Sequence, residues 1–218
     1  MKNIFYFICI AILIGACVKE SDTSHLSSPL EQRAAVFDTF IKPFNESWLY
    51  FASNKEPTGK WTQLNYNDSI WPDGKAELGY GDGDEVTVVP RSYLFSRNAN
   101  MTTYFRKKIF LSAAQVTNLL QFFVNVHRDD GAVVYVNGVE KIRSNMPSGI
   151  IKYSTPALDT MEGAAVGPRS ENVSYNTTIQ AFGLKAGWNI IAAEIHQFSV
   201  REKDMSFGLT IYTMRSTN

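Results

Sequence analysis

Three carboxylates lie within four residues among glycines, at Asp82, Asp84 and Glu85. Calcium prefers several oxygen ligands, and a glycine-rich loop lets backbone carbonyls join carboxylates around the ion. The run does not match the spaced acidic pattern of an EF-hand loop. The alternative is a solvated acidic turn, in which aspartate side chains hydrogen-bond their own backbone. The sequence therefore marks a candidate calcium site and leaves the acidic turn as the other interpretation.

A second acidic pair, Asp129 and Asp130, follows His127 and Arg128 at the end of an alternating segment. In one interpretation, these side chains bind sugar hydroxyls at a loop end of the fold. In the other, the two aspartates close a turn through bonds to their own backbone, and Gly131 supplies the special backbone angle. The first interpretation makes all four polar residues candidate ligand-binding groups.

Glu194 and His196 share one face of the strand predicted over residues 189–197, because side chains along a strand alternate between its faces. Such a pair can orient one another or contact a ligand. We favour a structural polar cluster, in which neighbours such as Asp204 or Ser206 satisfy the two side chains. His196 is also kept as a ligand-binding candidate.

Tryptophan faces can stack on sugar rings, so the placement of the four tryptophans matters. Trp48 and Trp188 flank predicted strands and are assigned to packing. Trp71 stands beside Pro72 and the turn pair Asp73-Gly74. This position predicts that Trp71 is the exposed aromatic platform.

The inventory of reactive residues argues against catalysis. The sequence has three histidines, too few for a two-metal phosphatase, and it has no Gly-x-Ser-x-Gly nucleophile elbow. The enzymatic alternative is glycoside hydrolysis by paired carboxylates, which requires Asp129, Asp130 and Glu194 to converge in space. We therefore expect a protein that is not an enzyme.

The elements that must position these residues are β-strands. Residues 132–136 form a β-rich run that ends on Asn137-Gly138, the pair best suited to a tight type I′ hairpin turn. Residues 119–127 alternate between apolar and polar side chains, as a half-buried strand does. Similar short runs recur at residues 48–53, 86–89, 104–111, 189–197 and 207–214. The pattern predicts an all-β fold with one two-sheet sandwich over residues 44–218.

The first residues predict export and anchoring. Residues 1–16 combine Lys2, a short apolar run and a small pair just before Cys17, which resembles a bacterial lipobox and implies lipidation of that cysteine. The alternative is an ordinary secretory signal. Residues 17–43 then form a tether that contains either a short helix beginning near Pro29 or an edge strand over residues 36–40. We expect a lipid-anchored protein of the bacterial outer membrane or cell surface.

Charge and cysteine content narrow the partners. Lys and Arg number 21, as do Asp and Glu, so the formal net charge is zero. A near-neutral chain without a basic run argues against nucleic acid and against an anionic membrane surface as partner. Cys9 lies in the predicted leader and Cys17 would carry lipid, so no thiol is left for a disulfide or a thiolate metal site. The lipid anchor is the membrane contact that we expect.

Several segments form a recognisable series along the chain, namely Trp61 and residues 71–74, 78–85, 103–106, 129–131, 145–147, 194–197 and 204–207. Together they resemble the galactose-binding-like jelly-roll domains of secreted bacterial proteins. Such domains accompany secreted metallophosphatases, and the Val-Tyr-Val-Asn-Gly hairpin also resembles the sugar-binding jelly roll of family 2 glycoside hydrolases. The resemblance implies a jelly-roll sandwich, structural calcium and a ligand-binding role that includes Asn145. This superfamily binds many ligands, so the resemblance names no particular sugar.

Two functions follow as hypotheses. We favour a non-catalytic cell-envelope lipoprotein that binds a glycan or polysaccharide, with any partner enzyme or envelope protein on a separate chain. The alternative is a surface scaffold that contacts other proteins. Sugar binding predicts a concave, aromatic-lined site near Asp129 and Asp130, whereas scaffolding predicts a flat apolar patch without a pocket.

Overall fold

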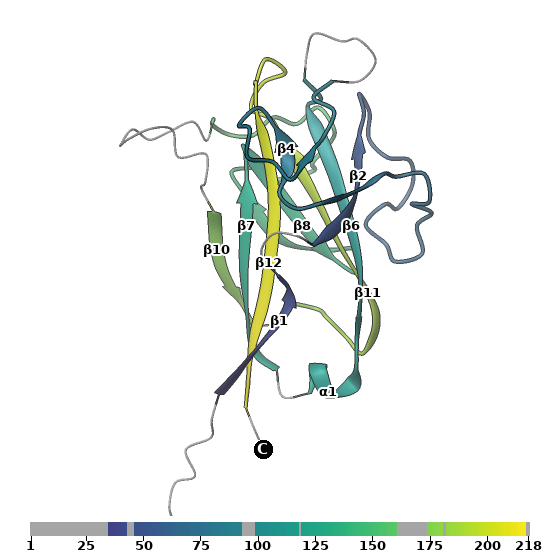
Figure 1. The fold of residues 1–218 in the computed structure, drawn as a ribbon, viewed down its shortest axis with the longest axis vertical. Helices are drawn as coiled ribbons and strands as arrows, with labels where there is room; N and C mark the ends of the chain where they lie inside the picture. Colours follow the sequence, from purple (N-terminus) through teal and green to yellow (C-terminus); the bar gives the residue numbers. More distant parts are fainter. Residues whose placement is uncertain are drawn as a thin grey trace, which may run out of the picture. The chain divides into compact units, whose positions relative to one another are not determined.

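The computed structural model describes residues 35–42, 46–92, 99–117, 119–160, 174–180 and 182–216. Two six-stranded sheets face each other in a sandwich (Figure 1). Sheet A has the order β10 (Ser174–Ile179), β7 (Leu119–Arg128), β12 (Met205–Ser216), β4 (Leu78–Tyr80) and β5 (Thr87–Val88), and β1 (Ala35–Ile41) also pairs with β12. Sheet B has the order β3 (Asp73–Lys75), β2 (Ser47–Ala52), β6 (Thr102–Leu111), β11 (Gly187–His196), β8 (Gly131–Val136) and β9 (Val139–Ser144).

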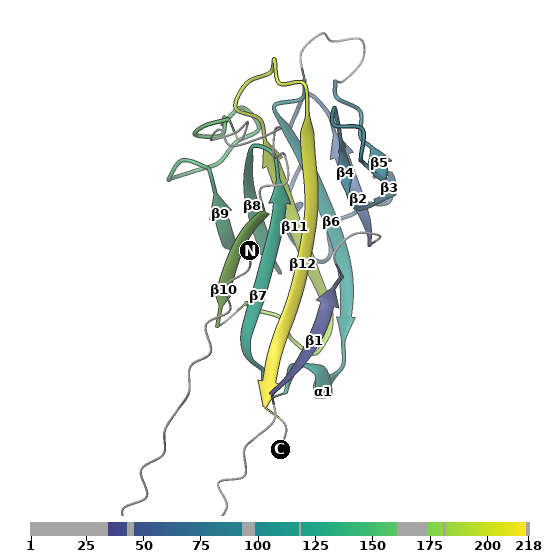
Figure 2. The same cartoon turned by 60° about the vertical axis from the view of Figure 1, so that its left-hand side comes forward.

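The chain changes sheets repeatedly from β6 onward. Strands β6, β8, β9 and β11 lie in sheet B, whereas β7, β10 and β12 lie in sheet A (Figure 2). This is the jelly-roll β-sandwich that the sequence predicts, so the predicted fold class is confirmed. Between β6 and β7 the described chain forms one short helix, α1 (Ala113–Val116), which begins at a capping box made by Ser112 and Gln115.

The core lies between the sheets and follows the alternation of side chains along the strands. Phe105 stacks on Phe207 with ring centroids 4.0 Å apart, and Trp48 packs edge-on against Phe207 at 5.0 Å. Trp48 is 1% exposed, which confirms its assignment to packing. The buried, alternating side chains of β7, β11 and β12 are Phe122, Val124, Val126, Ile191, Ala193, Ile195, Phe207, Leu209 and Ile211. The other side chains of these strands therefore form the outer faces of the sandwich.

The β8–β9 hairpin has the turn that its sequence predicts. Asn137 and Gly138 both have positive φ angles, 51° and 84°, as a type I′ turn requires. The Asn137 side chain also bridges to the neighbouring strand, because its Oδ1 accepts from the backbone N–H of Ile190 at 3.0 Å. The hairpin is therefore fixed both by its backbone and by a contact to β11.

The first described strand resolves the two interpretations of the tether. Residues 35–41 form β1, which runs antiparallel to β12, so this stretch is a strand and the sandwich begins before the predicted boundary at residue 44. The predicted leader, Cys17 and the rest of the tether up to residue 34 lie outside the described residues. Among the described residues, no helix is long and apolar enough to cross a membrane.

A buried arginine holds the segment that precedes β3 against the outer face of sheet B. Arg106 is 0% exposed, and its Nε donates a hydrogen bond to Asp68 Oδ2 at 3.0 Å. The guanidinium also donates to the carbonyl oxygens of Trp61 and Gln63. It lies 4.9 Å from the centre of the Tyr66 ring, within the range of a cation–π contact. Asp68 thus balances a cation that is removed from solvent.

Candidate functional site

The Asp129–Asp130 loop is enclosed by the protein. Asp129 and Asp130 are 5% and 1% exposed, and Asp130 Oδ2 accepts a hydrogen bond from the backbone N–H of Phe198 at 2.7 Å. Arg128 donates to the carbonyl oxygen of Asp130 and, through Nε, to the Ser144 hydroxyl at 2.9 Å. Both carboxylates are therefore turned inward, which leaves little surface for the sugar contacts considered from the sequence.

Asn145, the other polar residue at this end, also bonds within the protein. Its Nδ2 donates to the carbonyl oxygens of Asp130 at 3.1 Å and of Asp159 at 2.7 Å. The residue has a positive φ of 54°, which asparagine tolerates better than most residues. Asn145 therefore ties the loop after β9 to the loop before β8.

Asp129 lies in an environment that opposes its ionisation. Burial of the carboxyl has the largest effect, and the negative charge and hydrogen bond of the neighbouring Asp130 act in the same direction. Together they raise the pKa of Asp129 to about 9. The carboxylates of Asp204 and Asp82 contribute in the same direction. The loop therefore holds a proton at neutral pH, a property that the sequence pattern alone does not reveal.

His196 and Glu194 belong to a buried polar cluster on the outer side of β11. His196 is 0% exposed, with Nδ1 2.8 Å from the carbonyl oxygen of Thr155 and Nε2 3.2 Å from Glu194 Oε2. Glu194 Oε1 accepts from the Tyr135 hydroxyl at 2.6 Å. The pair thus has internal partners, as the structural interpretation expects. Those partners are Thr155 and Tyr135 in place of the Asp204 and Ser206 that we expected.

Trp71 and Trp188 have the opposite exposure to the one predicted from the sequence. Trp71 is 5% exposed, stacks on Phe51 at 5.2 Å and packs edge-on against Tyr66 at 5.8 Å, so the prediction that it is an exposed platform is wrong. The cause is the set of hydrogen bonds from Arg106 to Asp68, Trp61 and Gln63, which holds the segment around Trp71 against sheet B. Trp188, which we assigned to packing, is 56% exposed, so that prediction is also wrong.

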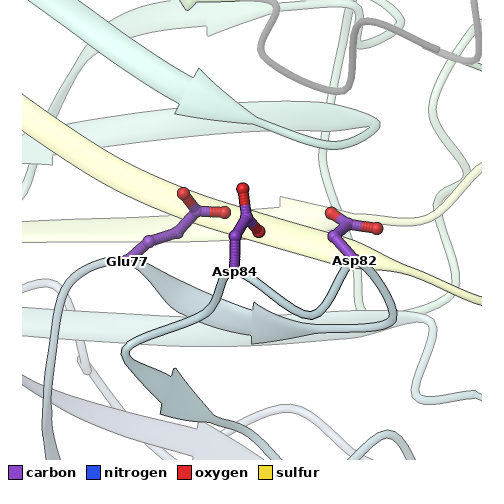
Figure 3. Close-up of side chains that lie close together, drawn as sticks. All are labelled: Glu77, Asp82 and Asp84. Carbon is purple, nitrogen blue, oxygen red and sulfur yellow. The ribbon is translucent and has the colours of Figure 1, made fainter. Parts of the chain in front are cut away.

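Three carboxylates meet at the start and end of β4. Ligand atoms of Glu77, Asp82 and Asp84 all lie within 4.8 Å of one another (Figure 3). Glu77 is buried, Asp82 is half-buried and Asp84 is exposed. Oxygen ligands at this density suit a hard divalent cation, and neighbouring backbone carbonyls can complete its shell. The group therefore could hold a metal ion.

The composition of this cluster corrects the predicted ligand set. Glu85 Oε1 and Oε2 accept from the backbone N–H groups of Asp82 at 2.9 Å and Gly83 at 3.0 Å, so Glu85 closes the turn. Its place in the cluster is taken by Glu77, which sequence reasoning missed. The chain after β4 turns back to Glu77, whose carbonyl oxygen accepts from the backbone N–H groups of Val86 and Thr87, both at 3.0 Å.

Glu77 also connects the cluster to β7. His127 Nε2 lies 3.3 Å from Glu77 Oε1, and both side chains are less than a tenth exposed. Burial opposes the charge of Glu77, but the hydrogen bond and charge of His127 and the Ser206 hydroxyl outweigh it and lower the pKa of Glu77. Strand β12 lies between β7 and β4, so the imidazole passes over Gly208, where no side chain obstructs it.

A hollow of about 350 Å³ lies on the outer face of sheet A, across β10, β7 and β12. Most of the residues that line it belong to three rows of paired residues, although Phe123 and Thr178 of the third row border only a second, smaller hollow. The rows are Ser174–His127–Gly208, Asn176–Asn125–Thr210 and Thr178–Phe123–Tyr212. Alternate rows on one face of a sheet are about 7 Å apart, so the three rows span about 14 Å along the strands. We call this surface the three-row groove.

Each row gives the groove a different chemistry. In the first row, the imidazole of His127 lies over Gly208, which has no side chain, and Ser174 has a small one. In the second row, Asn125 Nδ2 donates to Asn176 Oδ1 at 2.8 Å, and Asn176 Nδ2 donates to the carbonyl oxygen of Ser174 at 3.5 Å, so both amides are held in place. The polar face of residues 119–127 was recognised from sequence, but the pairing of β7 with β10 and β12 was not.

The third row is aromatic. Phe123 and Tyr212 stack with ring centroids 5.0 Å apart and an interplanar angle of 7°. Phe37 of β1 adds a third ring, 6.4 Å from Tyr212, and is 61% exposed. A second hollow of about 120 Å³ borders Tyr212 and Asn176, so the groove continues past the amide row to the rings. Tyr212 itself is 37% exposed.

Comparison with known proteins gives no family assignment. No protein-family model matches the sequence, and no curated protein matches it. Among solved structures, a β-glucuronidase from glycoside hydrolase family 2 aligns with 85% of this chain and 18% of its own, at 15% identity and a TM-score of 0.48. A β-glucuronidase from an uncultured Clostridium species aligns with 87% of this chain and 31% of its own, at 12% identity and a TM-score of 0.47.

A family 2 glycoside hydrolase from Bacteroides cellulosilyticus aligns with 80% of this chain and 20% of its own, at 13% identity and a TM-score of 0.46. The chain thus spans less than a third of each of these three enzymes, none of which is a metallophosphatase. Sequence identity and TM-score are both low, so we carry no activity over from these enzymes. The function is argued below from the residues themselves.

Proposed function

We propose that this protein binds a polysaccharide, without cleaving it, in the three-row groove of sheet A. The observation that carries the proposal is a fixed amide row beside an aromatic row, because Asn176 and Tyr212 line both hollows of the groove. Sugars present hydroxyl groups that both donate and accept hydrogen bonds, which the amides of Asn125 and Asn176 match. They also present apolar C–H faces, which pack on rings such as that of Tyr212.

The groove favours binding over scaffolding because it is concave and polar at its centre, in contrast to a flat apolar patch. Binding without hydrolysis is supported by the carboxylates. Asp130 accepts from the Phe198 backbone and Glu194 accepts from Tyr135, so neither faces the other across a cleft. Export, and anchoring through lipid on Cys17, remain part of this proposal.

Substitutions in the groove should weaken retention on the polysaccharide that the protein binds. In affinity electrophoresis of the full chain against a panel of neutral and acidic polysaccharides, we expect Tyr212→Ala and Asn125→Ala each to reduce affinity at least tenfold, about 1.4 kcal/mol. The matched control is Phe198→Ala, which removes another exposed aromatic side chain away from the groove. Retention that is unchanged in both groove variants, or absent across the panel for the folded protein, would contradict the proposal.

We also propose that Glu77, Asp82 and Asp84 hold a structural calcium ion. A ligand that binds only the folded state at one hundred times its Kd adds about 2.7 kcal/mol of stability. For a domain of this size, that corresponds to a rise in Tm of roughly 5 to 10 °C.

Differential scanning calorimetry with calcium or with EDTA measures this rise in Tm. The rise should disappear in Asp84→Asn, whose exposed side chain is not part of the core, and should persist in the control Asp73→Asn. An equal Tm with calcium and with EDTA in the unaltered protein would exclude the calcium site. It would leave the groove proposal unaffected.

A further inference from the structure

An exposed aromatic pair lies on the other side of the sandwich, on the outer face of sheet B. Trp188 of β11 and Phe110 of β6 are direct cross-strand neighbours, with ring centroids 5.4 Å apart and an interplanar angle of 72°. They are 56% and 59% exposed. Farther along the same face, Trp61 and Trp71 cover Tyr104. The segment that contains Trp61 and Trp71 does not cover Trp188. Trp188 lines a hollow of about 280 Å³ together with Leu64 and Lys108.

The polar side of this hollow carries excess positive charge. Asp68 binds two cations, because Oδ2 accepts from Arg106 at 3.0 Å and Oδ1 lies 3.2 Å from Lys108 Nζ. One carboxylate between two cations leaves a net charge of +1. The Arg106 side chain is 0% exposed and that of Lys108 is 42% exposed, so Lys108 presents this charge to the hollow.

The size of the patch determines what can occupy it. A fully buried aromatic side chain contributes 150–250 Å², so the exposed halves of Trp188 and Phe110 offer roughly 200 Å² together. A stable protein partner needs about 800 Å² on each side. A single sugar ring needs only one aromatic face and a few polar groups at its edge.

We propose that Trp188 and Lys108 form a second carbohydrate site, which takes one pyranose ring that bears a carboxylate. The apolar face of the ring stacks on the indole of Trp188, and its carboxylate pairs with the Lys108 ammonium. The site is on the opposite sheet from the three-row groove. It stands whether or not the groove binds a polysaccharide.

Quenching of tryptophan fluorescence reports selectively on this site. The other three tryptophans, Trp48, Trp61 and Trp71, are at most 5% exposed, so acrylamide quenches Trp188 preferentially. With the full chain, we expect glucuronate to protect Trp188 from acrylamide and glucose at equal concentration to protect it several-fold less. Sodium chloride at matched ionic strength is the control for non-specific anion effects.

One variant tests the carboxylate contact, and a second tests whether the site is independent of the groove. Lys108→Gln should reduce the protection by glucuronate several-fold while leaving any response to glucose unchanged, because Asp68 keeps its bond to Arg106. Tyr212→Ala, the groove variant, should leave the fluorescence response intact. Absence of protection by glucuronate, or equal protection by glucuronate and glucose, would overturn the proposal. Either result would leave retention on polysaccharide through the groove to be judged by its own variants.

Discussion

Asp68→Ala should destabilise the sandwich by about 3–5 kcal/mol, the usual cost of removing one partner from a buried ion pair. Arg106 would keep its charge inside the protein, with carbonyl oxygens and the rings of Tyr66 and Trp71 as its remaining partners. Burial lowers the pKa of Arg106, and Asp68 is the group that opposes this effect, so the variant loses the compensation. The free energy of unfolding, measured by urea titration with circular dichroism, gives the loss directly.

Two further variants keep this experiment interpretable. Asp73→Ala removes an exposed aspartate and should change the free energy of unfolding by no more than about 0.5 kcal/mol. The double variant Asp68→Ala with Arg106→Leu removes both charges, and it should recover part of the stability, because an apolar pair can replace a buried ion pair. A loss below 1 kcal/mol in Asp68→Ala would show that Arg106 does not depend on Asp68.

Asp129→Asn should make the protein more stable at alkaline pH and no more stable near pH 4. Folded Asp129 keeps its proton up to a pKa of about 9, whereas the unfolded chain releases it near the ordinary value of 3.8. The free energy of unfolding therefore falls as pH rises between these two values, by about 1.4 kcal/mol per pH unit for one proton. Asparagine cannot ionise, and its amide can still donate to Asp130, so this fall should disappear.

Thermal unfolding at several pH values between 4 and 9, in EDTA so that no cation contributes, measures this effect. The difference in Tm between Asp129→Asn and the unaltered protein should be near zero at pH 4 and should grow with each step upward. Asp73→Asn, an exposed aspartate, should show no such growth. Parallel pH profiles for Asp129→Asn and the unaltered protein would mean that Asp129 is ionised in the fold.

Local sequence predicted most of the longer strands because each of their signals is local, but it did not predict β3, β4 and β10. The pair Asn137-Gly138 sets the hairpin through its own backbone angles. Alternation between apolar and polar residues identified the two faces of β7. The strand at residues 35–41 was the harder case, because helix and strand patterns overlap in a short apolar run and pairing with β12 decided between them.

The two tryptophan assignments were wrong for a different reason. Trp71 is buried by a contact with Arg106, a residue that lies far along the chain. For Trp188 a usable signal was present, because it shares the face of Glu194 and His196 and not the face of Ile191 and Ile195. The face of the strand on which a residue lies therefore predicts its burial better than its position near the end of the strand.

The three-row groove could not be predicted because it is a product of non-local pairing. Asn125 and Thr210 come from strands β7 and β12, and only their register places them side by side with Asn176. The candidate calcium cluster was predicted in part, since two of its three carboxylates are close in sequence. Glu77 was missed because the turn after β4 and the pairing of β4 with β5 bring the later carboxylates back to it.

The pairing of β1 with β12 places the first and last described strands of the sandwich side by side, so the sandwich could be inserted into another protein as a unit. Strand β1 runs beside the end of β12 (Figure 2), and Ala35 is the register partner of Ser216. Partners in an antiparallel ladder have Cα atoms about 5 Å apart. A surface loop of a host protein that opens by that distance could accept the whole sandwich through two adjacent junctions. A short linker across the same gap would also permit circular permutation. The order of strands along the chain is thus separable from their arrangement in space.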